Sequence, residues 1–214
     1  LRRDRGGGVK SLVLVRHGET EANRGGLFRG RLEIPLSQRG RMQAESIAPL
    51  LEGENPEVLF VSPLSRCVET ARLACPGRDY LVEERLNNLD VGSWAGVAKE
   101  RVKREEPELW RQWITSPETM RFPGGEGLED LRLRVSGFLD SFSRGPWQRG
   151  ALFTHRSVLK VLTATALGMT GESFWRFHFD NASVSRLILP EGRGWTLTLL
   201  NDTCLLKDFV QEWV

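Results

Sequence analysis

Histidine and arginine occur side by side where the first apolar run of the chain ends. The segment VLVRHGETEAN (residues 13–23) places Arg16 and His17 directly after branched apolar residues, and the chain has only three histidines. A second histidine, His155, and a further arginine, Arg66, also follow apolar runs. Guanidinium groups match the oxygens of a phosphoryl group with paired donors, and a neutral imidazole nitrogen can attack phosphorus. These side chains could therefore perform phosphoryl transfer if the fold brings them together.

The apolar runs predict that these side chains converge. Short apolar runs flanked by breakers are typical of buried strands, and amphipathic segments with capping residues are typical of helices. Strands and helices alternate, which indicates an α/β fold with a mostly parallel sheet and helices on both faces. The expected strands are residues 11–15, 57–63, 79–83 and 151–155, with helices at 36–53 and 64–75. The carboxyl ends of such strands form the ligand crevice, although a lone histidine could equally be a core residue.

The remaining segments predict a cap, a long helix and a hairpin. Residues 92–125 hold tryptophans and prolines with weak periodicity, and we expect short helices and loops that cap one edge of the sheet. Residues 126–143 have the period of a long amphipathic helix. Apolar runs on both sides of residues 191–194 indicate a β-hairpin. We therefore expect a three-layer sandwich with a small cap as one domain over residues 10–214, after a flexible tail at 1–9.

Composition narrows the class of protein. The formal net charge is +2 and the basic residues are scattered, so nucleic acid is not an expected partner. No uninterrupted apolar run of about 18 residues is present, so we expect no membrane association. Cys67, Cys75 and Cys204 lie in apolar surroundings without a C-x-x-C pair, which predicts buried free thiols in a reducing compartment, the cytoplasm. The cysteines also lack zinc-ligand spacing.

Several motifs together resemble one family. RHGETEAN is similar to the signature of the histidine phosphatase superfamily, which includes cofactor-dependent phosphoglycerate mutases. Other segments resemble this family in the same order, over roughly residues 10–200: FRGRLEIPLSQRGRMQA, VSPLSRCVETA, LDVGSWAG, FPGGEGLEDLRLRV and DNASVS. The resemblance implies a phosphoglycerate mutase-like fold and a phosphohistidine intermediate. It also implies that neither a metal ion nor another cofactor is needed.

The resemblance assigns roles by position. His17 matches the histidine that becomes phosphorylated. Arg16, Arg66 and His155 match the phosphate-binding residues around it. Asn23 matches a polar residue that often touches the phosphate. The expected partner is a small-molecule phosphomonoester, and a homodimer is left open.

One position departs from the family at the step that releases the leaving group. The family usually has a glutamate as general acid where LNNLDVGSW has Asn88. An amide has no proton to give at neutral pH, and general acid catalysis is worth ~10²–10⁴ in rate. Three explanations stay open. Glu83, Glu84 or Asp90 reaches the leaving oxygen, the protein is a slow or specialised phosphatase, or it is a degenerate member that binds a phosphorylated ligand. An engineered replacement of glutamate by asparagine would give the same sequence.

A second departure lies beside His155. The family commonly has glycines where this chain has Arg156, in THRSV. Arg156 either lies on the helix surface or faces the pocket and binds a substrate carboxylate or second phosphate. The glycines are also replaced in bacterial metal-independent phosphoserine phosphatases of this superfamily, which residues 171–189 and LNDTC resemble. His178 lies in that stretch, at the rim or against the substrate.

These observations favour a phosphomonoesterase acting on a small phosphorylated metabolite. Arg156, Glu83, Asp90 and His178 are the candidates for substrate contact, and phosphoserine, another carboxylated phosphate or a sugar phosphate are the candidate substrates. One alternative is a phosphoglycerate mutase-type phosphotransferase, which we rank lower because the cap is short. The other is a catalytically impaired member that binds a phosphorylated ligand, which Asn88 motivates.

Overall fold

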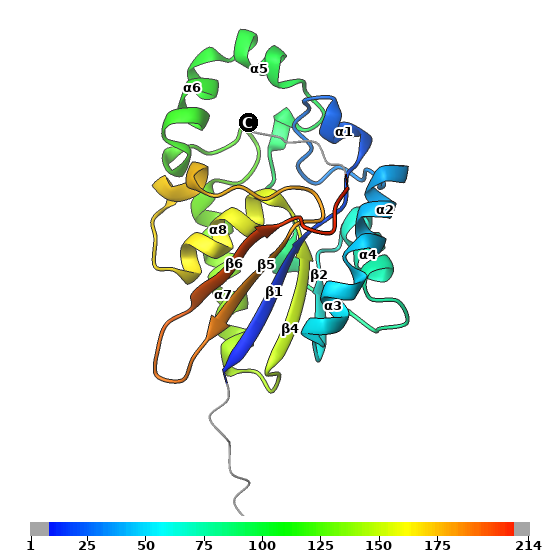
Figure 1. The fold of residues 1–214 in the computed structure, drawn as a ribbon. Coiled ribbons are helices and arrows are strands. Elements are labelled where there is room, and N and C mark those ends of the chain that lie inside the picture. The colour runs from blue at the N-terminus through cyan, green and yellow to red at the C-terminus, as the bar shows by residue number, and fades with distance from the viewer. Residues whose placement is uncertain (1–8, 208–214) are drawn as a thin grey trace, which may run out of the picture.

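A six-stranded sheet forms the centre of the protein (Figure 1). The computed structural model describes residues 9–207. The strand order is β3-β2-β4-β1-β5-β6; the first four strands in this order are parallel, and β5 is antiparallel to both of its neighbours. The strands are β1 (Lys10–Arg16), β2 (Val58–Val61), β3 (Leu81–Val82), β4 (Arg149–Thr154), β5 (Val184–Leu189) and β6 (Thr196–Asp202). The mostly parallel sheet and the C-terminal hairpin expected from the sequence are confirmed.

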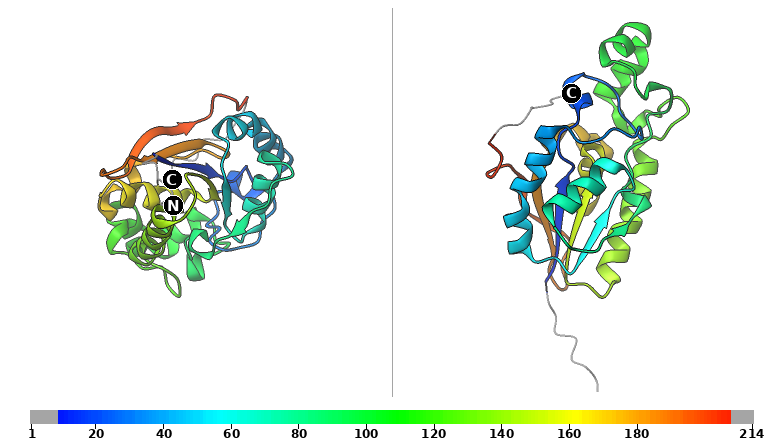
Figure 2. Two further views of the ribbon diagram at one scale, coloured as in Figure 1. Left: turned by 90° about the horizontal axis from the view of Figure 1, so that it is seen from below. Right: turned by 90° about the vertical axis from the view of Figure 1, so that its right-hand side faces the viewer.

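Alternate residues of the central strand enter two separate cores, because successive side chains of a strand point to opposite faces. Leu12 and Leu14 of β1 pack into one core, and Val13 and Val15 pack into the other. The first core is covered by α7 (Leu128–Arg144) and α8 (Arg156–Ala166), and the second by α2 (Gln38–Ser46), α3 (Ala48–Glu54) and α4 (Ser65–Ala74). The right-hand view of Figure 2 shows the sheet between these layers, so the expected three-layer arrangement is confirmed.

The helix expected after the first strand is in fact two helices. Ser37 caps α2, its side chain accepting from the N–H of Gly40. Pro49 lies in the first turn of α3, where its missing N–H leaves no hydrogen bond unmade. Within one continuous helix over residues 36–53, the same proline would remove a backbone hydrogen bond. α3 extends one residue beyond the expected end at Gly53. Asn55, with a φ of 43°, ends that helix in the left-handed conformation.

Residues 92–125, named the cap segment below, lie beyond the carboxyl ends of the strands (Figure 1). The segment contains short helices, as expected: η2 (Gly92–Trp94), α5 (Lys99–Glu105), α6 (Pro107–Thr115) and η3 (Pro117–Thr119). Aromatic contacts stabilise it: the ring centroids of Trp113 and Phe122 lie 5.1 Å apart. The ring of Trp94 also lies 4.9 Å from that of Phe28, which is outside the segment, in the loop after α1. The other short helices are α1 (Glu21–Arg24), η1 (Glu84–Leu86) and η4 (Gly171–Arg176).

Two of the three cysteines fit the prediction of buried free thiols. Cys67 and Cys75 are free and buried, and burial raises the pKa of the Cys67 thiol to about 12. Cys204 is exposed in the turn after β6, so the prediction of burial was wrong for it. Within residues 9–207, the helices are too short or too polar to cross a membrane. The predicted flexible tail lies outside the described residues, except for Val9.

Candidate active site

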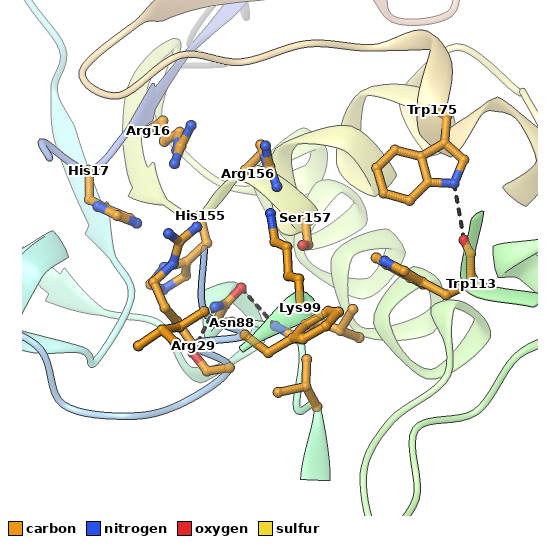
Figure 3. Close-up of a pocket in the computed structure, with 15 residues that line it drawn as sticks. Arg16, His17, Arg29, Asn88, Lys99, Trp113, His155, Arg156, Ser157 and Trp175 are labelled. Atoms are coloured by element: carbon orange, nitrogen blue, oxygen red, sulfur yellow. Dashed lines mark hydrogen bonds between the residues drawn. The ribbon is translucent and has the colours of Figure 1, made fainter. Parts of the chain in front are cut away.

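A cavity opens at the carboxyl ends of β1 and β4. The strand ends, the loop after α1, the cap segment, α8 and η4 all contribute to its wall. Its charged and aromatic lining residues include Arg16, His17, Arg29, Lys99, Trp113, His155, Arg156 and Trp175 (Figure 3). The inner end of the cavity is the part lined by Arg16, His17, Arg29 and His155. The outer end is the part lined by Lys99, Trp113, Arg156 and Trp175.

The register of two parallel strands brings the two histidines together. Arg16 at the end of β1 is paired with Thr154 at the end of β4. The backbone N–H of His17 donates to the carbonyl of Thr154 at 3.0 Å, so the next residue of each strand leaves the sheet at the same level. The rings of His17 and His155 therefore lie with centroids 5.3 Å apart. The convergence predicted from the strand ends is present.

His17 has the geometry of a nitrogen nucleophile. Its Nδ1–H donates to the carbonyl oxygen of Gly18 at 2.7 Å, because a carbonyl can only accept, and Nε2 therefore carries the lone pair. The side chain is buried. Burial holds the His17 pKa well below its ordinary value, and the positive charges of Arg66 and Arg16 lower it further. The imidazole is thus neutral at neutral pH, as attack on phosphorus requires.

The loop that carries His17 is held from three sides. The N–H of Gly18 donates to Thr70 Oγ1 at 3.0 Å, and Asn181 Nδ2 donates to the carbonyls of His17 and Gly18 at 3.1 and 3.3 Å. A Cβ atom at Gly18 would lie 2.3 Å from the carbonyl oxygen of Gly40, so α2 can pack this closely only on a glycine. The nucleophile is therefore fixed in place before any ligand binds.

Two buried arginines are anchored by backbone carbonyls. Arg16 Nη1 donates to the carbonyl of Phe179 at 2.8 Å. Arg66 donates to the carbonyls of Leu32 at 2.8 Å and Gly30 at 3.1 Å. Burial lowers the pKa of Arg66 to about 10, so it stays charged at neutral pH. Arg66 is not part of the cavity wall itself, but its charge acts on both histidines from behind that wall.

His155 precedes α8 as its N-cap residue and is oriented by a serine. Its Nε2 is hydrogen-bonded to Ser62 Oγ at 2.8 Å, and Ser62 directly follows β2. Burial holds the His155 pKa well below its ordinary value, and the charge of Arg66 adds to this effect. The resemblance assigned phosphate binding to this histidine. The lowered pKa keeps the imidazole neutral at neutral pH, and a bound phosphoryl dianion would raise that pKa.

Asn88 lines the cavity and fastens a neighbouring loop. Its Nδ2 donates to the carbonyl of Gly30 at 2.7 Å, and its Oδ1 accepts from the N–H of Leu89 at 2.9 Å. The carbonyl of Gly30 also accepts from Arg66, so Asn88 and Arg66 hold the same point of the loop. Arg134 donates to the backbone carbonyl of Asn88 at 3.0 Å and fixes this residue in turn. At the position where the resemblance implies a general acid, the amide of Asn88 instead holds a loop in place.

The structure does not bring the other predicted substrate contacts to the cavity. Glu83 is hydrogen-bonded to Arg85, and Asp90 accepts from the backbone at the start of η2. His178 Nε2 lies 2.9 Å from Asp180 Oδ1. None of these side chains is part of the wall, and the described wall residues include no aspartate or glutamate. The cavity lining therefore offers no support for a neighbouring carboxylate that replaces the missing acid.

Asn23 also has a role that the sequence did not indicate. Its Oδ1 accepts from both the backbone N–H and the hydroxyl of Thr20, each at 2.7 Å, and so caps α1. Asn23 is buried and is not part of the cavity wall. Arg156, in contrast, is in the wall, which favours the pocket-facing alternative over the surface alternative.

Sequence reasoning missed several polar residues of the site. Ser62, Thr70 and Asn181 orient the histidines, and each lies inside a quoted motif, so its polarity at a fixed motif position was an available signal. Arg29 and Lys99 enter the cavity from a loop and from the cap segment. No periodicity or strand end marks these two positions in the sequence.

The arrangement suits an anion rather than a metal ion. Arginines and histidines dominate the polar lining. No cluster of three histidine, cysteine, aspartate or glutamate side chains that could hold a metal occurs within residues 9–207. Guanidinium groups and imidazoles around one point can bind a phosphoryl group and stabilise its transfer.

Comparisons with known proteins agree with this chemistry. The family model described as the histidine phosphatase superfamily (branch 1) matches residues 12–203. The chain is 36% identical over 204 residues to phosphoserine phosphatase 1 of Hydrogenobacter thermophilus, covering 94% of this chain and 96% of the relative. It is 35% identical over 202 residues to the adenosylcobalamin/alpha-ribazole phosphatase of Salmonella typhimurium, covering 92% and 98%.

A solved structure extends the similarity to the fold. The structure described as a putative alpha-ribazole-5'-P phosphatase from Escherichia coli superimposes with a TM-score of 0.83 at 31% identity. The match covers 90% of this chain and 96% of that chain. The fold is therefore shared with this structure along nearly the whole chain.

Proposed function

The chain belongs to the histidine phosphatase superfamily and is a phosphoric monoester hydrolase, and we propose that it hydrolyses a small phosphorylated metabolite through a phosphohistidine at His17. The observation that carries this proposal is the hydrogen bond from His17 Nδ1 to Gly18 O at 2.7 Å. This bond fixes the tautomer and leaves Nε2 as the nucleophile. The burial and neighbouring charges that keep the imidazole neutral support the same role.

In the proposed first step the phosphoryl group docks at the inner end, and Nε2 of His17 attacks phosphorus in line with the leaving oxygen. An N–P bond forms and the P–O bond to the leaving group breaks. Arg16, Arg66 and His155 stabilise the charge on the phosphoryl oxygens. Because Asn88 has no proton to donate, the leaving alkoxide takes its proton from water. A second water then attacks phosphorus, releases phosphate and restores His17.

The identity of the substrate is part of the proposal, whereas the class of reaction, hydrolysis of a phosphoric monoester, is established. The compounds for which the relatives are named, phosphoserine and alpha-ribazole 5'-phosphate, differ widely outside the phosphate. These names therefore support only the statement that the metabolite is small. One specific observation favours a second candidate function. Asn88 removes the usual acid, so a member that binds a phosphorylated ligand with little turnover is the alternative.

We further propose that residues 10–214 act as one domain with the cap segment as an insertion that bounds the substrate pocket. Supporting this, Lys99 and Trp113 of the cap segment line the same cavity as the histidines. The cytoplasmic location and a homodimer stay predictions.

Hydrolysis of p-nitrophenyl phosphate tests the proposal, because its leaving group needs little protonation. We expect turnover that persists in excess EDTA and falls by ~10³-fold or more in His17→Asn, since loss of a nucleophile is among the largest single effects known in catalysis. Turnover that is abolished by EDTA, or equal in both proteins, would contradict the proposal. Binding of orthophosphate without any turnover would favour the ligand-binding alternative.

A further inference from the structure

The outer end of the cavity carries charged groups that the proposed phosphoryl transfer does not use. Lys99 is the first residue of α5, and Arg156 is the first residue of α8. Their side chains point toward each other across the cavity (Figure 3). Trp113 and Trp175 form the wall beside them, and Trp175 Nε1 donates to the carbonyl of Trp113 at 3.1 Å. This bond joins the cap segment to η4 as one wall.

The cavity wall is cationic from end to end. Arg16 and Arg29 line the inner end, and Lys99 and Arg156 line the outer end. The described part of the chain contributes no carboxylate to this wall. A cleft lined by one sign of charge concentrates ligands of the opposite sign. The lining therefore suits a ligand whose negative charge is not confined to one end.

A buried lysine packs against the aromatic rings of the outer end. Lys160 Nζ lies 4.4 Å from the ring centroid of Trp175 and 4.7 Å from that of Phe174. Its pKa is lowered to about 7, first by burial and then by the charges of Arg156 and Arg16. Lys160 is not part of the wall, but its cation–π contact helps to hold the Trp175 ring.

We propose that Lys99 and Arg156 bind a second anionic group, a carboxylate or a phosphate, on the same substrate whose phosphoryl group binds at His17. The inference rests on the proposed function, because it needs the phosphoryl group at the inner end. A guanidinium and an ammonium that face each other can both donate to one anion between them, and such charge-assisted bonds are the strong ones. Trp113 and Trp175 close the outer end on the side away from His17 (Figure 3).

One binding group from each end of the cavity starts from the same short stretch of chain. Arg156 follows His155 directly, and consecutive Cα atoms are about 3.8 Å apart. The binding groups for both anions therefore start from neighbouring residues at the beginning of α8. Both sets of binding groups line one cavity, so the proposed class is a small phosphomonoester with a second acidic group.

Matched substrate pairs test the proposal. O-phosphoserine and O-phosphoethanolamine differ by one carboxylate, and fructose 1,6-bisphosphate and fructose 6-phosphate differ by one phosphate. We expect the protein to prefer the doubly anionic member of at least one pair in kcat/KM. Arg156→Ala and Lys99→Ala should each reduce that preference by about 10- to 100-fold, the value of a hydrogen bond to a charged group. Lys103→Ala, an exposed lysine one turn further along α5, should leave it unchanged.

The outcomes separate the two proposals. A preference in the first pair identifies a carboxylate, and a preference in the second identifies a phosphate. No preference in either pair, or variants that slow both members equally, would overturn the second anion site. Calorimetric binding of the same four compounds to the His17→Asn protein gives the preference without turnover. Absence of hydrolysis with a retained binding preference would therefore count against the proposed function alone.

Discussion

The two ends of the cavity hold positive charge in different ways. At the inner end, Arg16 is buried and anchored on a backbone carbonyl, and Arg66 is held in the same way behind the cavity wall. At the outer end, Lys99 and Arg156 are half-buried and project from the first turns of two helices. The inner groups need no rearrangement when charge develops on a phosphoryl group, which is where fixed dipoles and charges are most effective.

This difference assigns phosphoryl transfer to the inner end and substrate selectivity to the outer end. The inner end is built by the sheet, whose strand register sets the histidines side by side. The outer end is built by the cap segment, η4 and the start of α8. Loops and insertions vary more readily than a sheet does, so relatives with one inner end can act on different metabolites. Changes at the inner end should therefore affect all substrates alike, and changes at the outer end should affect some more than others.

The largest change expected from a single phosphate-binding side chain is at Arg66. Arg66→Ala removes a buried charge next to both histidines and releases the loop at Gly30, so we expect kcat/KM to fall by ~10²–10³. The loss should be equal for phosphoserine and phosphoethanolamine, because both present the same phosphoryl group. Steady-state kinetics check this. Arg72→Ala, an exposed position on the same helix, is the control. An unequal loss would contradict the division between the two ends.

A gain of function is expected at Asn88, which lies between the two ends. Asn88→Glu supplies a proton donor, so hydrolysis of alkyl phosphates should rise by about 10- to 100-fold while that of p-nitrophenyl phosphate changes little. The gain is below the full value of general acid catalysis because the bond to Gly30 O is lost, at about 1 kcal/mol. Asn88→Gln, with the same length but no acid, should give no gain. Equal acceleration of both substrates would show that the acid is not what this site lacks.

A smaller kinetic effect is expected at Ser62, which touches His155 but not the proposed phosphate position. Ser62→Ala removes one buried hydrogen bond at 2.8 Å, so kcat/KM should fall by about 2- to 10-fold. Ser65→Ala, an exposed serine after the same strand, should match the unchanged protein. If Ser62→Ala is as damaging as loss of Arg66, the serine has a direct role that the geometry does not indicate.

The smallest perturbation is a change of pH, which leaves the side chains in place. The His17 and His155 pKa values are lowered by burial and by neighbouring arginines, so both imidazoles should still be neutral at pH 6.5, where an ordinary histidine is half protonated. The unfolded chain binds these protons first, so the free energy of unfolding should decrease as pH falls below about 6.5. Nitrogen-15 NMR of the rings, assigned with His17→Asn and His155→Asn, measures the protonation of each imidazole as a function of pH. A midpoint at or above 6.5 for His17 would contradict it.

The sequence predicted the inner end better than the outer end for a physical reason. A strand forces alternation and ends at one edge of the sheet, so Arg16, His17 and His155 could be placed from apolar runs alone. The position of Lys99 depends on how the cap segment folds back over the sheet, and no local pattern encodes that. Glu83 and Asp90 lie close to Asn88 in sequence, but their carboxylates form hydrogen bonds outside the cavity.

Helix boundaries and side-chain direction show the same limit. The periodicity of residues 36–53 is continuous, and only Pro49 marked the break between α2 and α3. Arg156 could have lain on either face of its helix, because the first turn of a helix points its residues in several directions. The tertiary structure was needed to place Arg156 in the cavity wall and Asn23 in a helix cap.

The central claim is that His17 carries the phosphoryl group during turnover. Rapid quenching of the protein with a phosphorus-labelled phosphoester, followed by peptide mapping, tests it directly. We expect acid-labile, base-stable phosphate on the peptide that contains His17, with up to one equivalent per chain, and none in His17→Asn. Turnover of the same ester with no phosphoenzyme at any time, or label on another residue, would contradict the account.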